Sequence, residues 1–337
     1  MTRPFHPIYL SVVLGLGAVI FCKSEAYAQK SAMLFPGSIN DQSWNAQGYS
    51  GLTRLKELGY ETAYSENVPA ADHVEAMRGY ARRGFNLVIG HSGRFLSAAQ
   101  RVGPEFPNVQ FVSGSGAGGQ GKNVMSIDFA KPQFGCQIGI LAARMSKSRK
   151  IGGVYALEGL PAVVAIAGSM RLCAKQTRPN VEVNIVYIKD IEDAAEAKEA
   201  AFSLIAGGAD MLTGFLNAGQ TGMIQAGKEK GVFVTGRSFG HTAIAPEVVL
   251  TNIIEQWAEM YAAIGEDVKA GKTSGEFKVY GYDTPPVTGA TLQQTPDRAF
   301  HPAVPVSAVA EIEATARLFA AAELKVAPTR EDARPGK

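Results

Sequence analysis

The sequence predicts an α/β protein with two lobes, each built around a parallel β-sheet. Short apolar runs alternate with segments of helical periodicity along nearly the whole chain. This alternation is typical of repeated βαβ units, whose sheets are covered by helices on both faces. The alternation falls into two successive sets, at about residues 29–125 and 128–247. A chain of 337 residues is long enough to form two lobes of ordinary size.

The expected strands are apolar stretches typical of strands that are buried on both faces. They lie at 31–35, 86–90, 109–113, 123–129, 150–155, 181–188, 210–216, 231–235 and 248–252. Two intervening segments carry an apolar face at helical spacing, formed by Tyr49, Leu52, Leu55 and Leu58 in 45–58 and by Ala194, Ala197, Ala201 and Leu204 in 192–206. Further helices are expected at 254–270 and 307–323, on either side of a Gly/Pro-rich segment at 281–305.

The order of these elements predicts how the chain divides. Residues 29–126 and 252–280 are expected to form lobe 1, and residues 127–251 and 281–327 are expected to form lobe 2. The tail, 328–337, is polar and contains two prolines and a glycine, so it is expected to be disordered.

The first 28 residues have the features of an export signal. Arg3 and His6 form a weakly basic start, an apolar run extends from Ile8 to Phe21, and Ala26-Tyr27-Ala28 fits a cleavage site before Gln29. The run is shorter than a membrane-spanning helix requires. Cys22 raises the alternative of a lipoprotein, although no small residue precedes it, and an uncleaved N-terminal anchor is a second alternative. We therefore expect a periplasmic protein.

Charge and cysteine content narrow the function classes. Without residues 1–28 the chain has 31 Lys and Arg and 30 Asp and Glu, a net charge of +1. Near-neutrality gives no support for binding to nucleic acid or to a membrane surface.

Two cysteines, Cys136 and Cys173, lie after the signal-like segment, both in expected helices. Export permits a disulfide between them, but we expect two buried free thiols.

The turn after the first strand predicts a ligand-binding site. Asn40, Asp41 and Trp44 lie between the strand at 31–35 and the helix that follows it. Ligands bind at the carboxyl edge of such sheets. The two polar side chains can supply directional hydrogen bonds, and the indole can stack on a planar ring. The combination indicates recognition of a polar molecule that contains a ring.

Three further candidates follow other strands of the first set. His91 comes directly after the strand at 86–90, where it would line the site, unless it is an exposed loop histidine. Asp128 and Phe129 end the strand at 123–129, where the chain is expected to pass between the lobes. Phe129 is either a second stacking wall or a core residue.

Candidates in the second set are Asn217, Arg237 and Phe239, which follow the strands at 210–216 and 231–235. Asn217 fits either an amide contact with a ligand or a helix N-cap. Arg237 fits either a receptor for an anionic or carbonyl group or an ion pair at the surface or between the lobes. Trp257 fits best as a core residue beside Ile253 and Tyr261.

No catalytic set and no cofactor motif is convincing. The sequence contains no HExxH, P-loop or CxxC motif, and the histidines have no metal-ligand spacing. The glycines at 114, 116 and 119 have the spacing of GxGxxG, but no helical pattern opens after them, which the dinucleotide fingerprint requires. We therefore expect no catalytic residues, no metal and no cofactor.

Taken together, these pieces resemble the basic membrane protein family, the purine nucleoside receptors of bacterial ABC transporters. The clearest piece is the stretch from Asn40 to Asn45, which is similar to that family's acidic-x-Ser-aromatic-Asn motif. Other similar pieces, in the same order, lie at 88–90, 106–111, 139–143, 208–210 and 245–251. The resemblance covers about residues 30–325.

The resemblance implies a type I periplasmic binding protein, whose two doubly wound lobes are joined by three crossings. It also implies capture of a purine between the lobes and delivery to a permease in the inner membrane. Trp44 would take the place of the stacking aromatic, Asn40 and Asp41 would be the polar contacts beside it, and Asn217 and Phe239 would face the ligand. We expect a monomer with no nucleic-acid partner.

One departure from the family bears on the ligand. Members that bind nucleosides typically carry an Asp in the loop after the strand at 231–235, and here that loop reads Gly236-Arg237-Ser238-Phe239-Gly240. A free base, or an oxidised purine whose negative charge meets Arg237, therefore fits at least as well as a nucleoside. The alternatives are another aromatic or carboxylic ligand, a sensing module that docks on a receptor, and an enzyme such as a nucleoside hydrolase.

Overall fold

The structure is a computed structural model that describes residue 1, residues 29–41 and residues 44–336. The predicted signal peptide, with Cys22, lies outside the described residues except for Met1. The same holds for Gln42 and Ser43 in the turn before the first helix.

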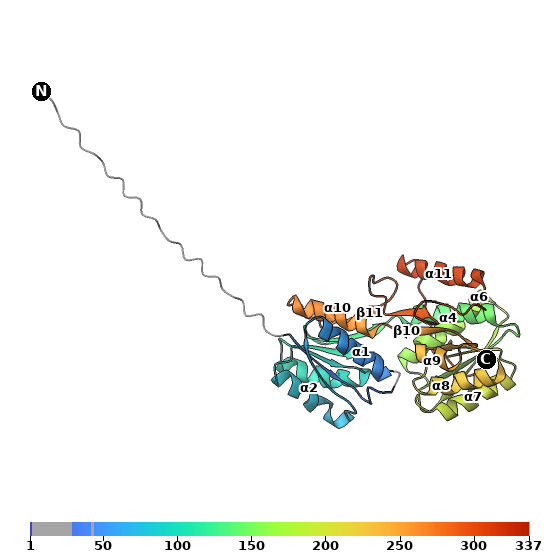
Figure 1. Cartoon of the computed structure of the whole chain (residues 1–337), viewed down its shortest axis with the longest axis horizontal. Coiled ribbons are helices and arrows are strands. Elements are labelled where there is room, and N and C mark those ends of the chain that lie inside the picture. The colour runs from blue at the N-terminus through green and yellow to red at the C-terminus, as the bar shows by residue number, and fades with distance from the viewer. Residues whose placement is uncertain (2–28, 42–43, 337) are drawn as a thin grey trace.

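Lobe 1 contains a six-stranded sheet with the order β11-β5-β4-β3-β1-β2, and all neighbouring strands are parallel (Figure 1). The strands are β1 (Lys30–Leu34), β2 (Glu61–Ser65), β3 (Leu87–Gly90), β4 (Gln110–Gly114), β5 (Val124–Phe129) and β11 (Phe277–Tyr280). The helices around it are α1 (Trp44–Glu57), α2 (His73–Arg82), α3 (Leu96–Val102) and α10 (Trp257–Lys269), with short 3-10 turns η1 (Ala70–Asp72), η2 (Gly93–Phe95) and η3 (Gly103–Glu105).

Alternating side chains of the central strands bury both faces of this sheet. Met33 and Phe35 belong to one core cluster with residues of α1 and α10. Ala32 and Leu34 belong to a second cluster with residues of α2 and α3. Because successive side chains of a strand point to opposite faces, a continuous apolar run supplies both clusters at once.

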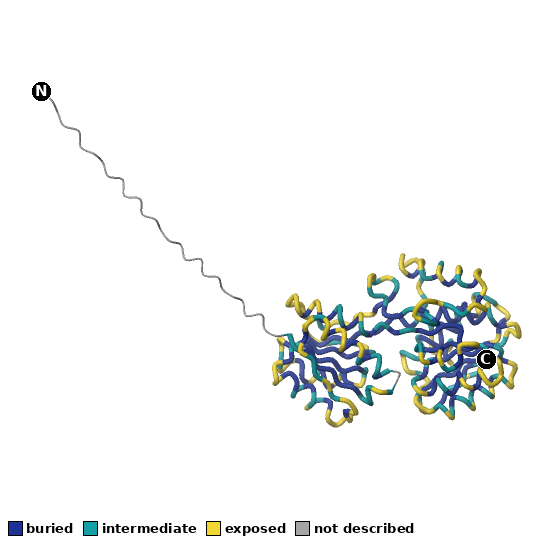
Figure 2. The backbone as a smooth tube through the Cα atoms, viewed as in Figure 1, coloured by how far each residue is buried: buried dark blue, intermediate teal, exposed yellow. Residues whose placement is uncertain are grey.

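Lobe 2 contains a second six-stranded sheet with the order β12-β10-β9-β8-β6-β7. Its strands are parallel except for β12, which pairs with β10 in antiparallel register. They are β6 (Lys150–Ala156), β7 (Glu182–Ile188), β8 (Met211–Gly214), β9 (Phe233–Gly236), β10 (Val249–Glu255) and β12 (Ala290–Gln293). Figure 2 shows that the strands form the buried interior of each lobe.

Helices cover both faces of the second sheet as well. One core cluster joins the sheet to α4 (Lys131–Met145), α6 (Ser169–Thr177) and α11 (Val306–Ala320). The other joins it to α7 (Ala194–Ala206) and α8 (Gly219–Lys230). The remaining elements are α5 (Pro161–Val163), the π-helical turn η4 (Val164–Gly168) and α9 (Phe239–Ile244). The prediction of two doubly wound parallel-sheet lobes is confirmed.

The chain crosses between the lobes three times. It crosses from β5 into α4, from β10 into α10, and from β11 into β12. The first two crossings come a few residues later than the expected boundaries after 126 and 251. Both strands stay in the sheet of the lobe they leave until their last residues, Phe129 and Glu255, because their backbones are still hydrogen-bonded there.

The C-terminal segment differs from the expected disordered tail. Gly336 exchanges two backbone hydrogen bonds with Ile185 of edge strand β7, at 2.9 and 3.1 Å. The buried guanidinium of Arg171 donates to the carbonyl oxygens of Asp332 and Gly336, and Ala333 is buried. The composition of 328–337 is polar, but backbone pairing and a buried arginine fix the described part, 328–336, on lobe 2.

The cysteine expectation is wrong. Cys136 of α4 and Cys173 of α6 form a disulfide, with their Cα atoms 5.0 Å apart. The two helices pack closely against each other: an added Cβ at Gly139 of α4 would lie 2.2 Å from the carbonyl oxygen of Met170. Glycine at this position lets the helices approach, and the approach brings the two sulfurs within bonding distance.

Candidate functional site

The predicted site residues lie at the carboxyl ends of strands in both lobes. Trp44 and His91 follow β1 and β3 in lobe 1, and Asn217 and Arg237 follow β8 and β9 in lobe 2. The two groups meet at a hydrogen bond in which Gln47 Nε2 of α1 donates to the backbone oxygen of Arg237 at 3.5 Å. The carboxyl edges of the two sheets therefore face one shared region, where ligands of open α/β sheets bind.

Asp41 organises the turn that begins α1. Its Oδ1 accepts a hydrogen bond from the backbone N–H of Ala46 at 3.0 Å, and its Oδ2 accepts from the backbone and side-chain amides of Asn45 at 2.9 and 2.7 Å. A carboxylate here satisfies otherwise unpaired N–H groups and is favoured by the helix dipole. Asn40 beside it is exposed. Asp41 thus shapes the turn, while the side chain of Asn40 faces solvent.

Trp44 is held rigidly at the start of α1. Its Nε1 donates to the backbone oxygen of His91 at 3.0 Å, and its indole stacks on the His91 imidazole at 4.3 Å between centroids and 23° between planes. It also packs at 78° against Trp257, 5.0 Å away. Trp44 nevertheless remains half-buried. The arrangement is a fixed aromatic platform with part of its surface still open.

His91 supports this platform from inside lobe 1. It is fully buried, so it neither lines the site directly nor lies in an exposed loop. Its Nε2 lies 2.9 Å from the Trp44 carbonyl oxygen, which can only accept, so Nε2 carries the proton. Nδ1 then accepts from the Tyr261 hydroxyl at 2.7 Å. Burial lowers the pKa of His91 to about 4, which keeps the ring neutral at physiological pH.

Asp128 and Phe129 serve the first crossing. Asp128 is buried and pairs with Lys131, and its Oδ1 also accepts from the Phe129 backbone N–H at 2.9 Å. Phe129 belongs to the core of lobe 2, with Phe134 and Phe215 at 5.8 and 6.0 Å between centroids. Phe129 is therefore a core residue in this structure and not a stacking wall open to a ligand.

Arg237 forms a buried ion pair within lobe 2, so its pair lies neither at the surface nor between the lobes, the two places considered for it. Its Nε donates to Glu255 Oε1 at 2.9 Å, and its Nη2 donates to the same oxygen. Its Nη1 donates to the Leu216 carbonyl oxygen at 3.0 Å and to Asn217 Oδ1 at 2.8 Å. The guanidinium also lies 3.7 Å from the centroid of the Phe215 ring. Most of its donors are therefore occupied within the protein.

Glu255 is the partner that sequence reasoning missed. It is the last residue of β10, and its side chain is fully buried. Its Oε2 accepts from Trp257 Nε1 at 2.7 Å, while its Oε1 holds Arg237. The sequence analysis placed Glu255 inside the expected helix at 254–270, where a charged residue is ordinary, whereas in the structure β10 extends to this residue.

Asn217 and Phe239 lie on the lobe 2 side of the site, and both are half-buried. The Asn217 side-chain amide donates to Glu192 Oε1 at 2.6 Å, so the residue bridges Glu192 and Arg237. Phe239 is the first residue of α9. Asn217 therefore holds the loop after β8 in place, and the Phe239 ring keeps part of its surface accessible.

Gln47 is a second residue that sequence reasoning missed. Its amide nitrogen contacts lobe 2, but its Oε1 is buried and has no hydrogen-bond partner in the described part of the chain. Buried acceptors are nearly always paired in folded proteins. Gln47 Oε1 is therefore a candidate acceptor in this region.

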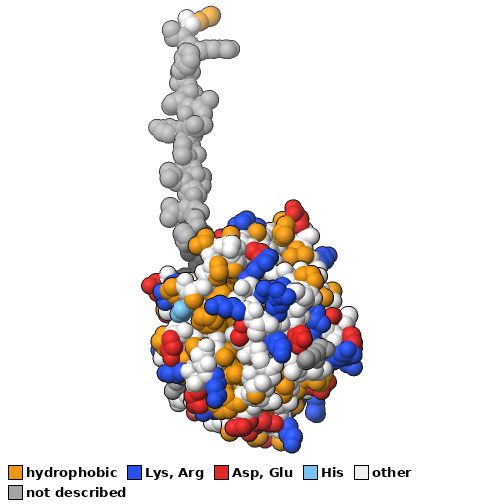
Figure 3. All heavy atoms as spheres, turned by 90° about the vertical axis from the view of Figure 1, so that its right-hand side faces the viewer, with side chains coloured by type: hydrophobic (Ala, Val, Ile, Leu, Met, Phe, Trp, Pro, Cys, Tyr) orange, Lys and Arg blue, Asp and Glu red, His pale blue; other side chains and the backbone are white. Residues whose placement is uncertain are grey.

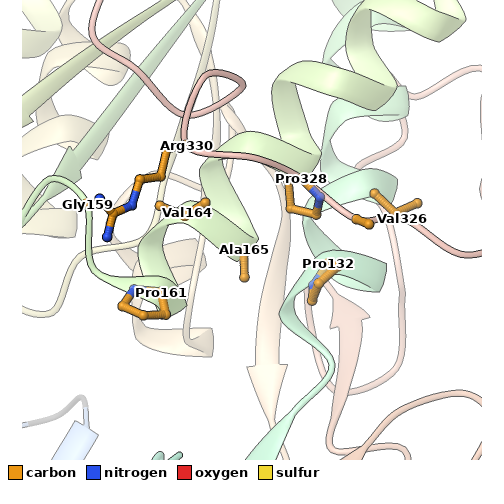
Figure 4. A pocket seen from close by; sticks show the side chains of 9 residues that line it. Pro132, Gly159, Pro161, Val164, Ala165, Val326, Pro328 and Arg330 are labelled. Carbon is orange, nitrogen blue, oxygen red and sulfur yellow. The ribbon is translucent and has the colours of Figure 1, made fainter.

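A cavity of about 440 Å³ lies elsewhere, within lobe 2 (Figure 4). Its walls come from the start of α4, the loop before α5, the turn η4 and the C-terminal segment, through Pro132, Gly159, Pro161, Val164, Ala165, Val326, Ala327, Pro328 and Arg330. None of the predicted site residues lines it.

Among the described residues, no group of three or more His, Cys, Asp or Glu side chains is placed to hold a metal ion. No described helix combines the length and apolar character needed to span a bilayer. The outer end of lobe 2 carries Lys and Arg interspersed with Asp and Glu (Figure 3).

Comparisons with known proteins agree with this picture. The chain is 28% identical over 274 residues to the transcriptional activator protein med of Bacillus subtilis, covering 81% of this chain and 85% of the relative. It is 27% identical over 273 residues to a purine-binding protein of Brucella abortus, covering 80% and 77% of the two chains. An ABC transporter solute-binding protein from Conexibacter woesei superposes with a TM-score of 0.74 at 27% identity, covering 89% of this chain and 99% of that one.

The family model described as ABC transporter substrate-binding protein PnrA-like matches residues 28–293. Proteins of this family bind substrates for transporters and are not enzymes. The fold, with two sheets joined by three crossings, is the type I periplasmic binding protein fold. The chain belongs to the PnrA-like family of ABC transporter substrate-binding proteins.

Proposed function

We propose that this protein captures a purine base between its two lobes and delivers it to an ABC permease in the inner membrane. The observation that carries the proposal is the half-buried indole of Trp44, which His91 and Trp257 hold in one orientation at the meeting point of the lobes. A preformed aromatic face with a few polar groups around it is typical of a site for a planar ligand.

The polar groups around Trp44 suit the edge of a purine. Gln47 Oε1 lacks a donor, Asn40 is exposed, and Phe239 is accessible on the opposite lobe. A purine base offers N–H donors and ring-nitrogen acceptors around two fused rings. The name of the Brucella abortus relative, a purine-binding protein, supports the same ligand class.

A base suits the site better than a nucleoside. The loop after β9 has no carboxylate that could hold ribose hydroxyls, and its one charged side chain, Arg237, is buried in an ion pair. The hydrogen-bonding groups of the ribose would then lose water without gaining a charged partner, which costs binding free energy.

Closure of the lobes would couple binding to delivery. Three crossings join the lobes, and Gln47 of α1 donates a hydrogen bond to the Arg237 backbone oxygen of lobe 2. A ligand that contacts both lobes stabilises the closed state over the open one. A permease that recognises the closed state would then select the loaded protein.

Export of the protein to the periplasm is part of the proposal. Disulfides persist in oxidising compartments and are rare in the cytosol. The disulfide between Cys136 and Cys173, and the signal-like first 28 residues, both support export. We propose that the mature protein acts there as a monomer.

A thermal-shift screen of the ligand-stripped mature protein tests the proposal. Nucleobases, nucleosides, sugars and organic acids are compared, because a ligand that binds only the folded state raises the melting temperature. Purine bases are expected to raise it, and nucleosides less so. A shift with sugars or acids and none with purines would contradict the purine assignment.

A sensing role for the same ligand is a second candidate, because the Bacillus subtilis relative is named a transcriptional activator. Uptake of labelled adenine by cells with and without the gene separates the two roles. Loss of uptake in the deletion strain supports transport. Unchanged uptake together with purine binding in vitro supports sensing.

A further inference from the structure

We propose that Glu255 sets the charge preference of the site, so that neutral purines are accepted and anionic purines are refused. This inference rests on the proposed function and specifies its substrate class. It starts from the position of the carboxylate. Glu255 is the last residue of β10 before the crossing into lobe 1, and its side chain has no exposed surface.

The two oxygens of Glu255 serve different lobes. Oε1 accepts from Arg237 Nε at 2.9 Å and also from Nη2, in the loop after β9 of lobe 2. Oε2 accepts from Trp257 Nε1 at 2.7 Å, at the start of α10 in lobe 1. A buried carboxylate is tolerated only when it is paired and hydrogen-bonded, and these three donors meet that need.

The ion pair with Glu255 neutralises the positive charge that Arg237 would otherwise bring to the site. The guanidinium would otherwise present a full positive charge at the carboxyl end of β9, beside the loop that carries Phe239. His241, which accepts from the Arg237 backbone N–H at 3.0 Å, adds no charge, because burial lowers its pKa to about 4. Asp128 and Lys131 pair with each other. Glu255 is therefore the group that cancels Arg237.

Electrostatic effects are strong at this place because water is largely excluded. Charges in a buried environment interact over several ångströms with little screening by salt. With Glu255 ionised, an anionic ligand meets no uncompensated cation and must still give up its hydration. A neutral base avoids this loss and keeps stacking and hydrogen bonds as its binding contacts. Glu255 thereby acts on specificity through Arg237, as a positioning residue.

The variant Glu255→Gln tests this assignment. Glutamine keeps the size of the side chain and one acceptor but removes the charge, so Arg237 becomes uncompensated. Calorimetric dissociation constants are measured for adenine, which is neutral, and for urate, which is an anion at neutral pH. The ratio of urate to adenine affinity is expected to rise at least tenfold over wild type. An unchanged ratio would overturn the inference.

Glu311→Gln is the matched control. Glu311 also pairs with an arginine, since Arg144 Nε donates to its Oε2 at 2.7 Å, but this pair lies on the exposed side of α4 and α11. Its loss should leave the affinity ratio unchanged. Emission of Trp44 and Trp257, the two tryptophans of the chain, reports independently whether Glu255→Gln disturbs the network. A larger ratio in both variants would overturn the inference, because the effect would not be local.

A second variant keeps the inference testable if Glu255→Gln fails to fold. The double variant Glu255→Gln, Arg237→Gln has no buried charge at this place and should keep the wild-type ratio. Arg237→Gln alone leaves the carboxylate uncompensated and should lower the ratio further. A wild-type ratio in Arg237→Gln, or a raised ratio in the double variant, contradicts the inference. Adenine binding by wild type upholds the proposed function in either case. Absence of purine binding by wild type would overturn both.

Discussion

At the scale of single residues, Trp44 serves both the fold and the proposed site. One part of its indole is covered by His91 and Trp257, and the remaining part is exposed. Trp44→Ala should lower purine affinity at least roughly tenfold, the loss of one stacking contact, and lower the free energy of unfolding by about 1–2 kcal/mol. Titration calorimetry and urea unfolding measure the two effects.

Trp44→Phe separates these two effects. Phenylalanine keeps a ring that can stack but loses the hydrogen bond from Nε1 to the His91 carbonyl oxygen. It should retain most of the affinity and lose most of the stability that the hydrogen bond contributes. Equal loss of affinity in the Ala and Phe variants would contradict a stacking role for the ring.

Two buried histidines make stability depend on pH. Burial lowers the pKa of His91 and of His241 to about 4, against an ordinary value of 6.5. The unfolded chain therefore takes up protons below about pH 6.5 that the folded chain refuses until about pH 4. Stability is full above pH 6.5 and falls as the pH drops, by a total on the order of 3 kcal/mol per histidine.

Urea unfolding between pH 7.5 and 4 measures this loss. His91→Gln should be less stable than wild type at pH 7.5, because both ring hydrogen bonds change, but its stability should fall less steeply with pH. A pH dependence that is identical in wild type, His91→Gln and His241→Gln would show that neither histidine is the cause.

At the scale of elements, the disulfide fastens α4 to α6. It closes a loop of 37 residues between Cys136 and Cys173. In the chain-entropy model such a loop stabilises the folded state by about 4 kcal/mol. The double variant Cys136→Ser, Cys173→Ser should lose stability of this order in urea unfolding. Addition of a reductant should destabilise wild type and leave the double variant unaffected; an equal response of both would contradict the role of the bond.

The C-terminal segment covers the edge of the lobe 2 sheet. Gly336 pairs with β7, and Arg171 and Tyr187 hold the backbone of 332–336. Unpaired sheet edges favour association between chains. A chain that ends at residue 327 should unfold at a lower temperature and aggregate sooner, as measured by light scattering during heating. Arg171→Met in the full chain should show the same change in weaker form, and an unchanged truncated chain would contradict the role of the segment.

The elements also show what the sequence could predict. Buried strands such as β1 and β3 are continuous apolar runs, so their pattern alone indicated them. Strands β2 and β11 were missed because they are edge strands with several exposed residues, and β12 because it lies in the Gly/Pro-rich segment. Chain order and the carboxyl-edge rule predicted that Trp44, Asn217 and Arg237 follow the carboxyl ends of their strands, as they do. The pairing of Arg237 with Glu255 depends on neighbours from another strand, which no local pattern reveals.

At the scale of the whole molecule, the crossings connect the site to the motion of the lobes. Asp128 and Phe129 end one crossing strand, and Glu255 ends another. Glu255, which holds Arg237, thus lies where the chain passes from one lobe to the other. A ligand that stacks on Trp44 and reaches Phe239 would therefore act directly on the segments that must bend during closure.

Titration calorimetry of the ligand-free mature protein with adenine and with adenosine tests the central claim most directly. The proposed site predicts binding of adenine with a dissociation constant in the micromolar range or below, which corresponds to about −8 kcal/mol or more favourable. It predicts that adenosine binds at least tenfold more weakly, because the loop after β9 has no carboxylate for the ribose. Tighter binding of adenosine, or no binding of adenine, would contradict capture of a purine base.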